Sequence, residues 1–126
     1  MKVLFAVVAG GAVGALARYL SMSAVGALFG SGFPWATLAV NVVGSFILGI
    51  LVELAALMWS PGEALRAFLV VGLLGAFTTF STFSLDVAVL YERGAMLSAA
   101  AYIIASVVLC VGGLFAGLAL VRAVYG

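Results

Sequence analysis

The amino-acid sequence predicts an all-α membrane protein with four transmembrane helices, the third of them broken in mid-membrane. Of 126 residues, 67% are hydrophobic and only 7% are charged, whereas a soluble domain carries about 25% charged residues. The apolar residues form long runs that short clusters of turn-forming residues separate. One of these runs contains a dense group of hydroxyl side chains. Lipid is therefore the expected solvent for most of the surface.

The charges and the missing residue types exclude several classes of function. Five Lys and Arg against four Asp and Glu give a net charge of +1, which provides no basic surface for nucleic acid. The sequence has no histidine, the commonest general base and metal ligand. Its single cysteine, Cys110, lies in an apolar run, where a thiol is usually unreactive. We therefore expect neither a nucleic-acid partner nor an enzyme.

Turn-forming clusters divide the apolar sequence into four spans. Residues 19–52 carry no charge, and this stretch is too long for one crossing, which needs about 20 residues. The chain is expected to turn at residues 30–34, 59–63 and 91–94, where Gly, Ser, Pro and charged residues gather. We expect one domain over residues 1–126, with spans near residues 3–28, 35–58, 65–90 and 95–122.

The charges near the ends of the spans give almost no orientation signal. With four spans, both termini lie on one side together with Lys2, Arg66 and Arg122, while Arg18 and Arg93 lie toward the other side. Orientation follows the Lys and Arg bias of short loops. Three cations against two is a weak bias, so the chain is expected to insert in both orientations, and opposed copies would pair as an antiparallel homodimer.

The second span carries polar residues at four-residue spacing. Thr37, Asn41 and Ser45 fall on one helical face. Asn41 is the most informative of them because its amide offers donors as well as an acceptor. An alternative role for Asn41 is a hydrogen bond between helices, which stabilises membrane bundles by about 1 kcal/mol.

The third span contains five hydroxyls and two aromatic rings within residues 78–84. No single helical face holds all seven, so a break is expected, which frees carbonyl and N–H groups to meet an ion. Gly72 and Gly75 just upstream make a break easier. The rings of Phe80 and Phe83 have positive edges that can stabilise an anion, although ordinary core packing is the commoner role for such a pair.

The last span carries a third polar pattern, and a few charges lie within the spans. A stripe of donors recurs every four residues and suits either a polar track or hydrogen bonds between helices; its members are Ser98, Tyr102, Ser106 and Cys110.

Glu53 and Asp86 are the carboxylates that a coupled exporter would need. Arg18 either attracts anions to a pore mouth or anchors its helix at the interface.

Three motifs resemble the Fluc fluoride-channel family, also called CrcB. They are GAVGALARY at residues 11–19, TLAVNVVGSF at residues 37–46, and GLLGAFTTFSTFS at residues 72–84. The resemblance extends over essentially the full chain, and the third motif is the most specific. It implies an antiparallel homodimer with two fluoride pores and passive export of fluoride from the cytoplasm across the bacterial inner membrane.

The resemblance also implies roles for individual residues. Phe80 and Phe83 would line the pores with their ring edges, and Asn41 would donate hydrogen bonds to the anion. A buried structural Na⁺ at the dimer centre would be held by main-chain carbonyls, for which Gly75 and Thr78 are the matching positions. The remaining pore residues would be Thr37, Ser81, Thr82, Tyr102 and Ser106, with Arg18 and Asp86 at the vestibules.

This sequence departs from the family pattern at two positions. Cys110 stands where a hydroxyl is expected, and Asp86 stands where the pattern often has glutamate.

Two other functions also fit a small four-span protein. One is a dual-topology, proton-coupled exporter, and the other is a non-conducting assembly subunit.

Overall fold

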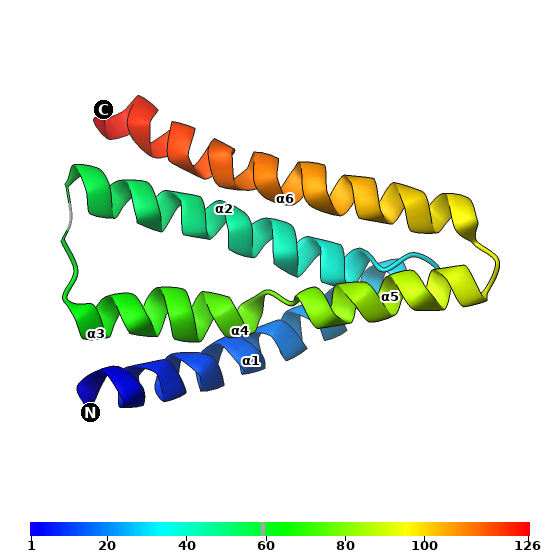
Figure 1. Cartoon of the computed structure of the whole chain (residues 1–126), viewed down its shortest axis with the longest axis horizontal. Coiled ribbons are helices and arrows are strands. Elements are labelled where there is room, and N and C mark those ends of the chain that lie inside the picture. The colour runs from blue at the N-terminus through cyan, green and yellow to red at the C-terminus, as the bar shows by residue number, and fades with distance from the viewer. Residues whose placement is uncertain (59) are drawn as a thin grey trace.

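The computed structural model describes every residue except Trp59. The first residue of the turn predicted at residues 59–63 therefore lies outside the described residues. The chain forms four long helical segments, which pack against one another along the bundle (Figure 1). They are α1 (Lys2–Phe29), α2 (Trp35–Leu57), a third segment over Glu63–Glu92, and α6 (Met96–Tyr125). Each is long and apolar enough to cross a membrane. The four predicted helices are therefore confirmed.

The third segment is divided into several pieces, which confirms the predicted break. They are α3 (Glu63–Arg66), the π-helix η1 (Ala67–Leu74), α4 (Gly75–Phe77) and α5 (Phe80–Glu92). Only Thr78 and Thr79, between α4 and α5, have extended backbone. Within residues 78–84 the irregular backbone is therefore confined to these two residues. A new helix begins at Phe80 because the Thr79 side chain accepts a hydrogen bond from the Thr82 N–H and caps it.

Two of the predicted turns contain glycines with left-handed backbone. Gly30, at the end of α1, has φ 77°, and Gly94, after α5, has φ 76°. These values suit glycine, which lacks a Cβ. The Gly30 N–H also bonds the Gly26 carbonyl at 2.9 Å, which satisfies one terminal carbonyl of α1.

Glycines allow two pairs of helices to approach closely. Gly10 and Gly14 of α1 lie directly against the backbone of η1, and a Cβ on Gly14 would collide with the Leu73 carbonyl. Gly49 of α2 and Gly117 of α6 make the equivalent contact on the other side of the bundle. Small residues of this kind let membrane helices pack through backbone contacts.

We expect Gly14→Val to lower the free energy of unfolding by about 1–3 kcal/mol, because the new side chain has to displace backbone of η1. Gly11→Val is the matched control, since nothing lies within 4 Å of a Cβ at that position. Reversible unfolding of both variants in detergent measures the difference. Equal stability of the two variants would contradict the close approach of α1 and η1.

Both termini lie at one end of the bundle, together with the end of α2 and the start of α3 (Figure 1). Near this end Glu53 of α2, which is 8% exposed, lies 3.0 Å from the Arg122 guanidinium of α6. The opposite end holds an apolar core of Leu38, Leu90, Ala99 and Tyr102. The break therefore lies between two packed ends of the same bundle.

Candidate functional site

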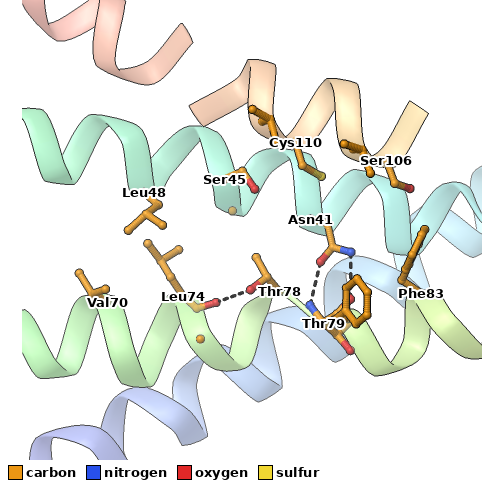
Figure 2. Close-up of a pocket in the computed structure, with 15 residues that line it drawn as sticks. Asn41, Ser45, Leu48, Val70, Leu74, Thr78, Thr79, Phe83, Ser106 and Cys110 are labelled. Carbon is orange, nitrogen blue, oxygen red and sulfur yellow. Dashed lines mark hydrogen bonds between the residues drawn. The ribbon is translucent and has the colours of Figure 1, made fainter. Parts of the chain in front are cut away.

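The side chain of Asn41 reaches from α2 to the break in the third segment (Figure 2). Its Oδ1 accepts a hydrogen bond from the Thr79 N–H at 2.8 Å, and its Nδ2 donates to the Thr79 carbonyl at 3.0 Å. The helix α2 and the third segment meet here at Gly44, where a Cβ would collide with the Thr78 side chain. Asn41 thus satisfies the backbone of Thr79, and its Nδ2 has a second N–H beyond this bond.

The break separates several carbonyl groups from their helical partners, among them those of Gly75 and Thr78. In a continuous helix the N–H groups of Thr79 and Thr82 would bond the carbonyls of Gly75 and Thr78. Here the Thr79 N–H donates to Asn41, and the Thr82 N–H donates to the Thr79 hydroxyl at 3.2 Å. Gly75 and Thr78 are the two positions expected to hold Na⁺. Free carbonyl oxygens fit that ion because hard cations prefer oxygen ligands.

Arg18 of α1 also contacts the break. Its Nε donates to the Ala76 carbonyl at 2.8 Å, a group that a continuous helix would pair with the Phe80 N–H. The Thr78 hydroxyl donates to the Leu74 carbonyl at 2.9 Å, one turn earlier. Side chains from α1 and α2 therefore supply partners for the interrupted backbone.

An open groove of about 400 Å³ lies beside the break, between α2, the third segment and α6. It brings together four predicted pore residues, Asn41, Phe80, Phe83 and Ser106, and it also contains both predicted sodium positions. Most of the remaining wall is aliphatic. Figure 2 shows that polar groups from α2, the break and α6 surround the same space. The groove is therefore the candidate site.

Two phenylalanines form one part of the groove wall. The rings of Phe80 and Phe83 lie 5.3 Å apart between centroids and are tilted by 43°. Phe80 is 77% exposed on the surface of the chain, whereas Phe83 packs on Tyr102 with centroids 5.1 Å apart. Neither ring is thus buried in the ordinary core, although Phe83 is partly packed against it.

Ser106 lines the groove and carries an unused hydrogen-bonding group. Ser106 is only 7% exposed. Among the buried side-chain oxygen and nitrogen atoms of the described residues, its Oγ alone has no hydrogen-bond partner. Buried polar groups are nearly always hydrogen-bonded, so an exception needs an explanation. A ligand in the groove would provide the missing partner.

The sequence of this chain matches a known family over most of its length. The family model described as "CrcB-like protein, Camphor Resistance (CrcB)" matches residues 5–118. The chain belongs to the CrcB family. This result confirms the resemblance that the three motifs indicated.

Relatives of this CrcB protein carry the name of an ion channel. It is 61% identical over 122 residues to the fluoride-specific ion channel FluC of Rhodospirillum centenum, covering 97% of each chain. It is 55% identical over 121 residues to the FluC protein of Nitrobacter winogradskyi, covering 96% of each. The FluC protein of Agrobacterium fabrum is 53% identical over 116 residues, covering 92% of this chain and 93% of the relative. With its four apolar helices, the CrcB chain is a multi-pass membrane protein.

Several predicted pore residues of the CrcB chain lie outside the groove lining. Thr37, near the start of α2, is buried, and the hydroxyls of Ser81 and Thr82 approach the Thr79 hydroxyl at 3.3 and 3.1 Å. Tyr102 is fully buried and donates from its hydroxyl to Asp86 Oδ2 at 2.9 Å. Ser81 and Thr82 thus lie beside the break, whereas Tyr102 belongs to the apolar core. The roles of all four residues in conduction stay predictions.

The groove lining also includes three polar residues that were not among the predicted site residues. They are Ser45, Thr79 and Cys110. Ser45 and Cys110 each follow a predicted site residue by one helical turn, which is the sequence signal that points to them. Among the described residues, no three His, Cys, Asp or Glu side chains come close enough to hold a metal ion.

Proposed function

We propose that this CrcB protein is a fluoride-selective channel subunit that passively exports fluoride from the bacterial cytoplasm across the inner membrane. The observation that carries the proposal is the groove, in which Asn41, Ser106, Phe80 and Phe83 face one space. Each of these side chains offers a hydrogen-bond donor or a positive ring edge. The name of the FluC relatives identifies the anion.

The chemistry of the groove suits a dehydrated anion in transit. Fluoride would accept hydrogen bonds from the second N–H of Asn41 Nδ2 and from the Ser106 hydroxyl, while the edges of Phe80 and Phe83 replace water. No charged side chain lines the groove among the described residues. Several weak contacts favour passage, because conduction requires that each bound state be easy to leave.

A second copy in the opposite orientation would complete the path. Gly75 and Phe80 are exposed on the surface of the single chain beside the open groove, and a partner would cover them. The four-helix domain, residues 1–126, would then form an antiparallel homodimer with two pores. Arg18 and Asp86 would act at the vestibules, and Thr37, Ser81, Thr82 and Tyr102 would continue the polar path.

A structural Na⁺ would be held by the carbonyl groups of Gly75 and Thr78. The support for this assignment is that the N–H groups of Thr79 and Thr82 bond other acceptors. When bound, the ion supplies a fixed positive charge near the anion path.

The coupled exporter fits the structure less well than the channel. An exporter needs a carboxylate at membrane depth that exchanges protons with its path. Glu53 is paired with Arg122 at 3.0 Å, and Asp86 accepts a hydrogen bond from Tyr102. Neither carboxylate lines the groove.

We expect Glu53→Gln to retain fluoride flux that needs no proton gradient, while its free energy of unfolding falls by about 1–2 kcal/mol as the ion pair with the partly exposed Arg122 is lost. Fluoride-electrode recordings of efflux from liposomes, with and without a pH gradient, measure the flux. Glu63→Gln, in an exposed position of α3, is the matched control. Strict proton coupling that Glu53→Gln abolishes would favour the exporter instead.

A further inference from the structure

The thiol of Cys110 lies in the groove described above. Cys110 is a free, partly buried cysteine on α6 that lines the groove, and it is the only cysteine in the sequence. Figure 2 shows it on the same helix as Ser106, with Asn41 and Ser45 on α2. We propose that Cys110 is a thiol-modification site through which a small, neutral, thiol-directed electrophile blocks anion flux. The proposal rests on the function proposed above.

The unpartnered hydroxyl of Ser106 places Cys110 next to a ligand position. Ser106 precedes Cys110 by four residues, about one helical turn, and its buried Oγ has no partner among the described residues. A ligand bonded to Ser106 would therefore meet the Cys110 S–H as the next polar group of α6 in the groove. A thiol is a weak donor, but it is still polar.

Modification would replace this donor with an apolar group. In the reaction with methyl methanethiosulfonate, the Cys110 thiolate attacks the CH₃S sulfur, a new S–S bond forms, and the S–SO₂ bond breaks. Methanesulfinate leaves with the electron pair, and the thiol proton passes to water. The product carries an S–CH₃ group on the Cys110 sulfur, on a groove wall to which Val107 and Val111 also contribute. An anion without its water shell would find no donor at this point.

The test uses the full-length protein in liposomes, with fluoride efflux recorded before and after methyl methanethiosulfonate. We expect treatment to lower the flux at least tenfold and dithiothreitol to restore it, with mass spectrometry confirming one modified thiol. Cys110→Ser conducts at its own rate, and that rate should not change on treatment. Cys110→Ala serves the same purpose if the serine variant does not fold.

The outcomes separate the two proposals. Full modification without a change in flux, or a conducting protein whose thiol does not react, would overturn the role of Cys110 and leave the channel intact. Loss of flux on treatment of both Cys110 variants would overturn it as well, because the reagent would then act elsewhere. Protein that conducts no fluoride before treatment would refute the channel, and the modification site with it.

Discussion

Replacing Asn41 with leucine is expected to lower fluoride flux about 10- to 100-fold. The variant removes both hydrogen bonds to Thr79 and leaves the Thr79 N–H and carbonyl without partners, at a cost of about 1–3 kcal/mol for each group. It also removes an amide N–H that would bond the anion. A hydrogen bond to a charged group contributes about 1.5–3 kcal/mol, and each 1.4 kcal/mol is roughly tenfold in rate. Efflux per folded protein in liposomes measures the loss.

Two further variants test the reason for this loss. Leu48→Val changes a groove residue that makes no side-chain hydrogen bond and should keep flux within a few-fold of the parent. Asn41→Asp keeps an acceptor for the Thr79 N–H but has no amide donors and adds a negative charge, so its flux should fall as far as that of Asn41→Leu. Near-parental flux in Asn41→Leu would show that Asn41 neither holds the break nor contacts the anion.

Phe80→Ile is expected to lower fluoride flux at least tenfold without loss of folding. The change removes the positive ring edge from the groove, and the 77% exposure of Phe80 means that little packing within the chain is lost. Phe83→Ile should lower the flux as well, but it also loses the contact with Tyr102. Flux measurements combined with chemical cross-linking of the proposed dimer separate the two effects.

Leu85→Ile is the matched control for Phe80. Leu85 lies on the same helix and is 62% exposed, but it does not line the groove. Its variant should conduct like the parent. Normal flux in both Phe80→Ile and Phe83→Ile would refute the proposed pore lining.

The helices and the position of the break could be predicted because their signals are local. Turn residues such as Gly30 and Gly94 lie within the clusters that separate the apolar runs. The hydroxyls of residues 78–84 mark the break because no helical face holds them all. The extent of the break could not be predicted, since Ser84 bonds back to the Phe80 carbonyl at 3.1 Å and stays in a regular helix.

The π-helix η1 had no such signal in the sequence. It brings Gly72 against the α1 backbone near Val7 and Gly10. These residues are far apart in the sequence, so their contact depends on how the helices pack. Wider turns of this kind often lie near functional sites, and η1 leads directly into α4 and the break.

The groove lining could be predicted only in part, because the key contacts join distant residues. Asn41 and Thr79 are 38 positions apart, and Arg18 and Ala76 are 58 apart. The polar stripe of α6 is also less uniform than its spacing suggests, because four residues exceed a helical turn and each step rotates by about 40°. Tyr102 therefore bonds Asp86, whereas Ser106 and Cys110 line the groove.

The most direct test of the fluoride channel is efflux from liposomes that contain the purified protein, recorded under an imposed voltage with fluoride or chloride inside. We expect rapid fluoride efflux that follows the voltage, needs no proton gradient and far exceeds the rate of a carrier, with little efflux of chloride. Liposomes that stay fluoride-tight around well-folded protein, or efflux that strictly requires a proton gradient, would contradict it.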